Sequence, residues 1–326
     1  MYSHTQLGIS VTDTAVTLAL AKRRGREWSV EHRARVDLPP GAVQDGTIRD
    51  VAAVAKGLKE CFGKVQTSGA TPAILCIPSR HVYGALLHLP SGTRRDDESV
   101  RSATQGLFPE PIDQMRLVSR ALPPDAAGAA TGVAAVRTDV LQPFIDTCAT
   151  AGITLRAVTT VPCAIATSRG IKAPLIVFLA GAENVQPSVT LLLQGWPIDE
   201  DILPAGTSPE DAAKAVTGLS EEYVAKGKPV GDVLVAAPSA VRTALTKGHA
   251  DAKTRAHSHA SSATTYRVTS LVTKEQDLEW LGATAAATAP VAKLLSLYGA
   301  PPPKKRKWYL VVMAVLLLVL LGLLLR

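Results

Sequence analysis

The most constraining feature of this sequence is a pattern of short apolar runs that occurs twice. The pattern is a strand, a small-residue turn, a second strand, a charged or glycine turn, a third strand and a Pro/Gly loop. It runs from Gly8 to Gly41 and again from Gly181 to Gly206. A duplication of this size can define a whole fold. We therefore expect two sheets of related topology, with the hairpins at 7–20 and 175–194 in equivalent positions.

Outside these repeats, buried-strand patterns and helix-like periodicity alternate, which predicts an α/β fold. With 326 residues, the chain is long enough for about two domains of roughly 100–200 residues each. Asp50 can cap a helix that Gly63 would end. The strand at 73–78 is expected to have the strand at 83–90 as its neighbour. The other expected helices are 96–108, 139–151, 208–226 and 278–299, and the other expected strands are 114–122, 132–137, 231–239 and 266–272.

The C-terminal part holds 18 consecutive apolar residues, from Trp308 to Leu325. A helix of that length spans roughly 27 Å, the short end of a membrane-crossing helix. A buried core helix is the alternative, and the dense flanking charge disfavours it. Since positive charge stays on the cytoplasmic side, we expect a single-pass membrane protein with residues 1–307 in the cytoplasm. The residues expected at the membrane interface are Lys304, Lys305, Arg306, Lys307, Trp308 and Tyr309.

The net charge of +7 is concentrated at the C-terminal end. The basic run 304–307 and Arg326 supply five of these charges, so the remainder of the chain carries only +2. A nucleic-acid-binding surface needs positive charge on the folded domain. We therefore expect this basic run to contact membrane lipids, and we expect no nucleic-acid partner.

Metal-binding and catalytic motifs are weak. The cysteines have no metal-ligand spacing and lie in apolar stretches, so buried reduced thiols are expected. His249, His257 and His259 fall in a polar loop at 247–265 without a carboxylate partner, which favours a solvated loop over a metal site. No GxxxxGK[ST], GxSxG or HExxH motif occurs.

Several stretches follow one another in the order and spacing of a known family. They include "LGISVTDTAVTLALA", "RVDLPPGAVQDGTIRD", "AILCIPSRHVYGALLHLP" and "VAAVRTDVLQPFIDTCATAGITLRAVTTVPCAIATS". Together they resemble the type IV pilus assembly protein PilM and its type II secretion relative GspL, over most of residues 5–210. The resemblance implies an α/β fold of duplicated actin-like (RNase H-like) lobes.

The resemblance also implies a domain plan. The second lobe should be reduced, because only about 26 residues separate Gly206 from the strand at Val233, where the family usually inserts a whole subdomain. The expected parts are a first actin-like lobe at 1–172 with a small inserted subdomain at about 91–136, a second lobe at 173–298, a Pro/basic linker at 299–307 and a transmembrane helix at 308–326.

The two hairpin turns depart from the family pattern. In the family each carries Asp-x-Gly, in which the Asp helps hold magnesium and the Gly admits the phosphates. In this sequence Ser10 and Leu179 stand at the two Asp positions. Both carboxylates, which would supply the oxygen ligands that Mg²⁺ prefers, are therefore absent from these turns. We therefore expect a pseudo-ATPase that hydrolyses no ATP and uses no cofactor, ATP and Mg²⁺ included. The degenerate nucleotide-hairpin positions are Gly8, Ser10, Thr12, Leu179, Gly181 and Gly206.

A partner site is implied by the resemblance as well. The N-terminal segment of a PilN-like single-pass membrane subunit would dock in a groove near residues 78–112, and a pilus or secretion motor ATPase is a further possible partner. The groove residues would be Ser79, Arg80, Arg101, Gln105, Phe108 and Pro109. Arg101 and Gln105 are four apart and so would share a helix face. Alternatively, Phe108 is ordinary core and Arg101 a solvated charge.

These features predict a non-enzymatic, membrane-tethered cytoplasmic scaffold of a type IV pilus or type II secretion inner-membrane platform. Two alternatives stay open. One is an active actin-like ATP-binding protein, which retained Asp and Gly residues in both turns would have favoured. The other is a tail-anchored adaptor unrelated to secretion.

Deleting 308–326 should release a soluble, folded chain, because both predicted lobes lie before that segment. Membrane fractionation with circular dichroism of the released protein is the measurement. Replacing the basic run 304–307 by glutamates in the full chain should weaken the orientation bias, read by protease protection in spheroplasts. A truncated chain that stays with the membranes would contradict the anchor.

Overall fold

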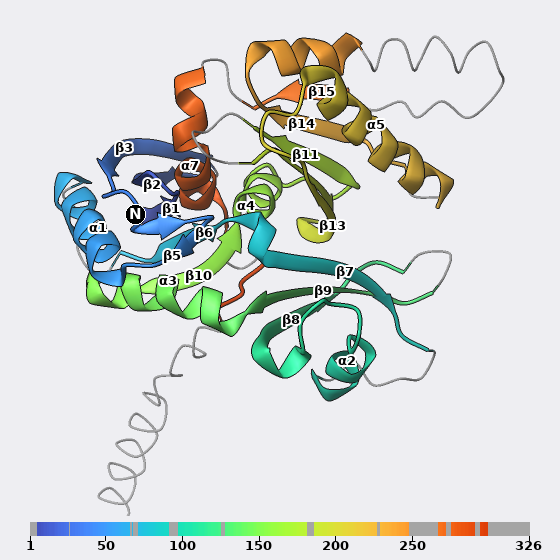
Figure 1. Ribbon diagram of the computed structural model, residues 1–326, viewed down its shortest axis with the longest axis horizontal. Coiled ribbons are helices and arrows are strands. Elements are labelled where there is room, and N and C mark those ends of the chain that lie inside the picture. The colour runs from blue at the N-terminus through green and yellow to red at the C-terminus, as the bar shows by residue number, and fades with distance from the viewer. Residues whose placement is uncertain are drawn as a thin grey trace, which may run out of the picture.

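The computed structural model contains two five-stranded sheets whose strands are arranged in equivalent order (Figure 1). It describes residues 5–25, 27–65, 67, 71–90, 97–124, 128–180, 186–226, 229–247, 267–271, 275–290 and 294–298. In each sheet an antiparallel meander of three strands is extended by two strands parallel to its first strand. The predicted duplication is confirmed, and the two hairpins occupy equivalent positions.

The first sheet has the order β10–β6–β1–β2–β3. Its strands are β1 (Thr5–Val11), β2 (Ala15–Arg24), β3 (Glu27–Asp37), β6 (Ala73–Ile77) and β10 (Leu155–Thr160). The loop after β3 carries a short hairpin of β4 (Val43–Gln44) and β5 (Thr47–Ile48). Helices α1 (Val51–Val65) and α3 (Thr138–Thr150) cover one face of the sheet, and α7 (Leu281–Thr288) covers the other. Because both faces are covered, β1 and β2 are buried along most of their length.

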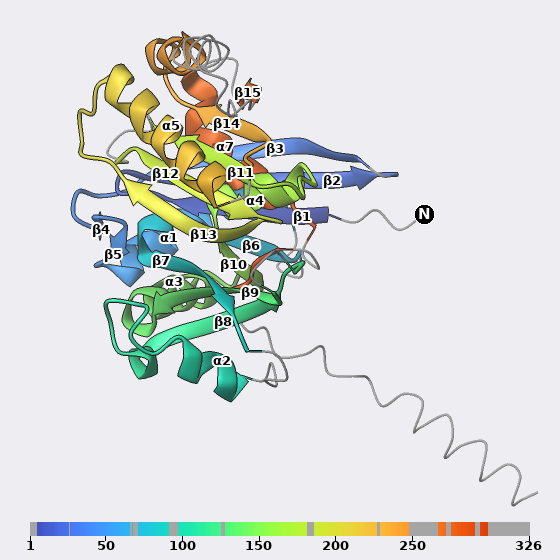
Figure 2. The same ribbon diagram turned by 90° about the vertical axis from the view of Figure 1, so that its right-hand side faces the viewer.

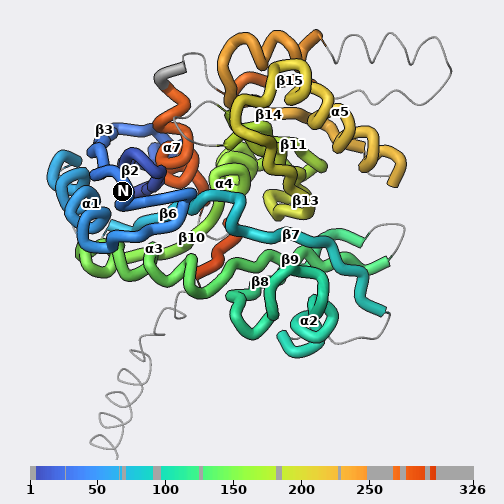
Figure 3. Tube along the Cα trace, viewed as in Figure 1, coloured from blue at the N-terminus to red at the C-terminus, as the bar shows by residue number. Residues whose placement is uncertain are grey.

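The second sheet has the order β13–β12–β11–β14–β15. Its strands are β11 (Leu175–Leu179), β12 (Ser188–Leu193), β13 (Trp196–Ile202), β14 (Asp232–Ala236) and β15 (Arg267–Ser270). Helix α5 (Pro209–Ala225) begins as predicted, since the Ser208 hydroxyl accepts the Asp211 N–H at 3.1 Å. Helix α4 (Val161–Ser168) and α7 lie between the two sheets (Figure 3).

An unusually close contact joins α7 to β1. A β-carbon at Gly8 would collide with the Ala283 carbonyl oxygen and the Ala287 amide nitrogen. The buried Gln6 amide donates to the carbonyls of Ala286, Ala287 and Ala289 at 2.8–3.1 Å, which satisfies the C-terminal end of the helix. The end of the second lobe is thereby bonded to the first strand of the chain.

A separate three-stranded sheet has the order β7–β9–β8, with β7 at Val82–His88, β8 at Met115–Ala121 and β9 at Ala130–Arg137. Our prediction that the strand at 83–90 pairs with the strand at 73–78 is wrong. The 3₁₀ turn η1 (Ser79–His81) redirects the chain, and β10 lies beside β6 instead. Helix α2 (Asp97–Ala103) packs on this sheet, as Figure 2 shows.

Three predicted helix ends are also wrong. Gly63 lies inside α1, which continues to Val65. Helix α2 stops at Ala103, short of the predicted 108, and the following turn contains Gly106 at φ +82°. The helix predicted at 278–299 starts as the 3₁₀ helix η3 (Glu275–Trp280) and ends at Thr288, because Pro290 disfavours helical geometry at the residue before it.

The structure tests the prediction for the cysteines but not those for the apolar segment or the three histidines. All four cysteines, Cys61, Cys76, Cys148 and Cys163, are free and buried, as expected. No helix in the described ranges is long and apolar enough to cross a membrane, and the segment 308–326 lies outside those ranges. His249, His257 and His259 lie outside the described residues too.

Gly8→Ala should destabilise the protein by about 1–3 kcal/mol, because the added carbon overpacks the α7–β1 contact. Gly63→Ala is the matched control. No atom lies within 4 Å of its added carbon, and alanine in a helix is about 0.5–1 kcal/mol better than glycine. Chemical denaturation measures both, and equal stabilities of the two variants would contradict the close contact.

Candidate functional site

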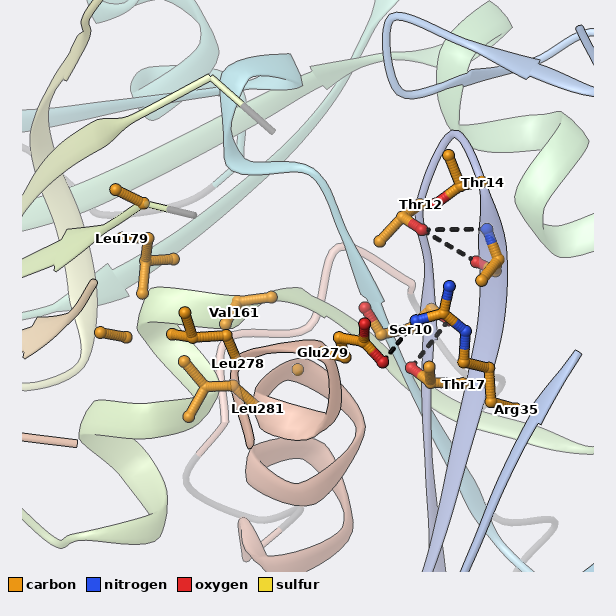
Figure 4. A pocket seen from close by; sticks show the side chains of 14 residues that line it. Ser10, Thr12, Thr14, Thr17, Arg35, Val161, Leu179, Leu278, Glu279 and Leu281 are labelled. Carbon is orange, nitrogen blue, oxygen red and sulfur yellow. Dashed lines mark hydrogen bonds and ion pairs between the residues drawn. The ribbon is translucent and has the colours of Figure 1, made fainter. Parts of the chain in front are cut away.

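The two sheets meet at a cleft where the equivalent hairpins face each other. A cavity of about 100 Å³ lies there. One wall comes from the first hairpin and carries the hydroxyl side chains Ser10, Thr12, Thr14 and Thr17. The opposite wall is apolar, as Figure 4 shows, and its labelled side chains are Val161, Leu179, Leu278 and Leu281.

The hydroxyls of the first hairpin hold their own turn together. The Thr12 hydroxyl donates to the Ala15 carbonyl and accepts the Ala15 N–H, both at 3.1 Å. The Thr17 hydroxyl donates to the Ser10 carbonyl at 3.4 Å. These groups maintain the tight turn, so two of the hydroxyls on this wall are engaged within the chain.

An ion pair lies along the same cavity. Arg35 of β3 is paired with Glu279 of η3 (Figure 4). Its Nε also donates to Asp37 at 3.0 Å. The hydrogen bond to Glu279 raises the pKa of the Arg35 guanidinium above its ordinary value. Arg33 lies over the Trp280 ring at 5.9 Å and 3.6 Å from Asp277. Two arginines of β3 thus bind the segment that leads into α7.

A second cavity, of about 90 Å³, lies on the other side of the first hairpin. Asp13 lines it, and its carboxylate accepts the backbone N–H groups of Asp45 and Gly46 at 3.0 and 2.8 Å. Ser79 and Arg80 line it as well. Both cavities are small beside the roughly 300–1,000 Å³ of common small-molecule sites.

Carboxylates do reach the cleft, but they have other partners. Glu279 pairs with Arg35, and Asp13 holds the β4–β5 turn. Within the described ranges, no three His, Cys, Asp or Glu side chains are arranged to hold a metal ion. The arrangement can bind the two lobes together, and it offers no ready set of Mg²⁺ ligands there.

Glu200 on β13 is a largely buried carboxyl near Ser79. Burial raises its pKa to about 7, while hydrogen bonds from Ser79 and Thr190 favour its charged form. The Thr190 hydroxyl donates to Glu200 Oε1 at 3.1 Å. The carboxyl therefore joins a strand of the second sheet to the η1 turn of the first lobe.

Similarity to known proteins decides the family. Residues 8–170, half of the chain, match the family described as Type IV pilus assembly protein PilM. The chain belongs to the PilM family. Among curated proteins, none matches the sequence.

Two solved structures are similar across most of the chain. The PilM-PilN type IV pilus biogenesis complex matches with a TM-score of 0.58 and 16% identity, covering 88% of this chain and 98% of that one. The cytoplasmic domain of EpsL, an inner membrane component of the Vibrio cholerae type II secretion system, matches with a TM-score of 0.53 and 10% identity, covering 91% and 98%. At these identities the likeness concerns the fold, which is the PilM/GspL-like actin fold.

The hairpin positions predicted from the PilM family are only partly brought together. Ser10, Thr12 and Leu179 line the first cavity. Gly8 lies beneath α7, where its role is close packing. Gly206 occupies an exposed turn at φ +80° with no atom within 4 Å of an added β-carbon. Gly181 lies outside the described residues.

The six residues predicted for the partner groove do not form one surface. Ser79 and Arg80 line the cavity between the lobes. Arg101 donates to the Ile112 carbonyl at 3.0 Å, and Phe108 is buried beside Tyr83, its ring 6.0 Å away. Gln105 follows the end of α2, so it does not share a helix face with Arg101; it and Pro109 are exposed. Phe108 is therefore core, the alternative that the sequence left open.

Sequence reasoning missed the groups that hold the cleft. Arg35 and Glu279 lie 244 positions apart, so no local pattern links them. Glu200 sits in a run of acidic residues, "DED", in which Asp199 and Glu200 are part-buried and Asp201 is exposed. Asp13 likewise bonds to backbone N–H groups of Asp45 and Gly46, which are 32 and 33 positions away, so no local pattern marks it.

The raised pKa of Glu200 predicts a pH dependence. An ordinary glutamate in the unfolded chain titrates near 4.3, so ionising Glu200 between about pH 4.5 and 7 costs folding stability. Glu200→Gln should remove this loss and stabilise the protein by about 1–3 kcal/mol at pH 8. Asp201→Asn, an exposed neighbour on β13, is the control. Urea unfolding at pH 5 and pH 8 measures the difference, and parallel curves for wild type and Glu200→Gln would contradict it.

Proposed function

We propose that this PilM-family chain is a non-enzymatic scaffold of a type IV pilus or type II secretion inner-membrane platform. The apolar segment 308–325 tethers it to the inner membrane, and the lobes stand in the cytoplasm. A PilN-like single-pass subunit is its principal partner, with a motor ATPase as a further one. The similar PilM–PilN complex supports this choice of partner, since the PilM in that structure is bound to PilN.

One observation carries the non-enzymatic part of the proposal. At the two positions aligned with metal-binding aspartates, the cleft presents Ser10 and Leu179. Among the described residues, the carboxylates that line the cleft, Asp13 and Glu279, are held by backbone N–H groups and by Arg35. A cleft of this composition supports a joint between lobes better than phosphoryl transfer, which depends on metal-stabilised charge.

Nucleotide binding distinguishes the scaffold from its alternative, an active actin-like ATP-binding protein. Thermal unfolding of the purified chain with ATP and Mg²⁺ should show no shift beyond that given by Mg²⁺ alone. A ligand at 100 times its dissociation constant would add about 2.7 kcal/mol of stability, which such a measurement detects. Magnesium-dependent stabilisation together with ATP hydrolysis would favour the alternative.

Partner binding tests the scaffold directly. A PilN-like subunit from the same organism should co-purify with the chain from detergent-solubilised membranes. The same subunit lacking its cytoplasmic N-terminal segment is the control and should be lost. Failure of the intact subunit to co-purify would overturn the proposed partner.

A further inference from the structure

At its start, β13 is packed tightly against the three-stranded sheet of the first lobe. A β-carbon at Gly84 on β7 would lie 2.4 Å from the Pro197 carbonyl oxygen. A β-carbon at Gly132 on β9 would lie 2.5 Å from the Trp196 ring. Because these contacts are steric and uncharged, they hold the start of β13 in place at any pH.

Further along β13, contact with the first lobe depends on an ionisable side chain. Glu200 accepts hydrogen bonds from the Ser79 hydroxyl of η1 and from Thr190 of β12, the latter at 3.1 Å. The β12–β13 register shifts between Leu191 and Leu192, so a β-bulge separates Glu200 from the packed start of the strand. A bulge bends its strand locally. The end of β13 can therefore shift while its start stays packed.

The Glu200–Ser79 contact lies at the wall of the second cavity, the one of about 90 Å³. Ser79 lines this cavity. Ser188 and Ile202 line it too, and they pair with each other two positions beyond Glu200 in the β12–β13 ladder. A single water needs only about 10–15 Å³, and hydroxyl groups are part of the lining. The cavity can therefore bring water to the Glu200 carboxyl if this wall loosens.

In the described part of the chain, no cation is paired with Glu200. On its own strand, Asp199 disfavours ionisation of Glu200. On η1, Arg80 and His81 face the β4–β5 turn, since a β-carbon at Gly46 would lie 3.1 Å from a nitrogen of each side chain. Burial is the largest effect on the carboxyl and raises the pKa of Glu200 to about 7.

Charged and titratable groups on the other neighbouring elements have partners or positions of their own. They are Glu222 and Lys226 of α5, which pair with each other; Arg137 of β9, which pairs with Glu110 and Asp139; Tyr83 of β7, which packs on Phe108; and His88, at the end of β7 away from η1. When Glu200 ionises, water is therefore the available source of stabilisation for its charge.

We infer that Glu200 is a pH-sensitive contact between the end of β13 and η1, which closes the second cavity when the carboxyl is neutral and opens it to water when the carboxyl is ionised. The neutral carboxyl tolerates burial, whereas the carboxylate regains hydration only by separating the two elements. This conformational property of the cleft goes beyond the proposed scaffold function and does not depend on the membrane, the partner or the absence of nucleotide.

Cys76 is a native reporter of this opening. It is buried and lines the second cavity, whereas the buried Cys61, Cys148 and Cys163 are not among the lining residues. The full-length chain in detergent is labelled with dithiodipyridine between pH 5.5 and 8, and mass spectrometry follows each cysteine. Thiol reactivity itself rises with pH, so the Cys76 rate in wild type is divided by the rate in Glu200→Gln at the same pH. This ratio should be about 1 at pH 5.5 and at least 3 at pH 8, with its midpoint near pH 7.

Two controls make the result specific. Asp201→Asn changes an exposed carboxyl next to Glu200 and should keep the wild-type profile. Cys148 separates local opening from unfolding, because opening of the cavity exposes Cys76 alone, whereas unfolding exposes all four thiols. A Cys76 ratio that stays near 1 up to pH 8, or that rises in parallel with the Cys148 ratio, would overturn the inference.

Discussion

The fold depends on the close approach of α7 to β1. Strand β1 lies near the start of the chain and α7 near its end. The two backbones approach so closely that only a residue without a side chain fits at Gly8. Gln6 bonds three carbonyls at the end of the helix. Because α7 follows the second sheet in sequence and packs on the first, this contact fixes how the lobes meet. A helix of small residues is what permits it, since Ala283 and Ala287 let the backbones approach.

The same contact shapes the cleft. Helix α7 begins next to the first hairpin, and a β-carbon at Gly282 would lie 2.7 Å from the Ser10 hydroxyl. A side chain at position 282 would therefore collide with Ser10. The segment entering the helix brings Leu278 and Glu279 to the cavity, where one adds apolar surface and the other pairs with Arg35. Interactions that hold the lobes together therefore line this cavity and engage the Glu279 carboxylate.

Local features of the fold were predictable, and long-range ones were not. Ser208 and Asp50 act as helix caps because capping is decided within three residues. The duplicated hairpins were visible because strand periodicity and turns are local as well. The strand at 82–88 was assigned the wrong neighbour. The three-residue turn η1 directs it to β9, and β10 takes the place beside β6. In the site, Ser10, Thr12 and Leu179 were found by alignment of turns, whereas Arg35, Glu279 and Glu200 depend on tertiary contacts that no local pattern encodes.

The first sheet and the three-stranded sheet differ in how their edge strands are covered. On the first sheet, the Leu297 N–H donates to Val158 of β10 at 2.8 Å, and arginines of β3 bind the η3 segment at the opposite edge. On the three-stranded sheet, β7 lies against β13, where a side chain at Gly84 would collide with Pro197. β8 is the other edge of that sheet, and it borders a groove of about 540 Å³. Leu294 and Ser296, which follow α7 in sequence, line the opposite side of that groove, so β8 lies next to the segment that comes after α7.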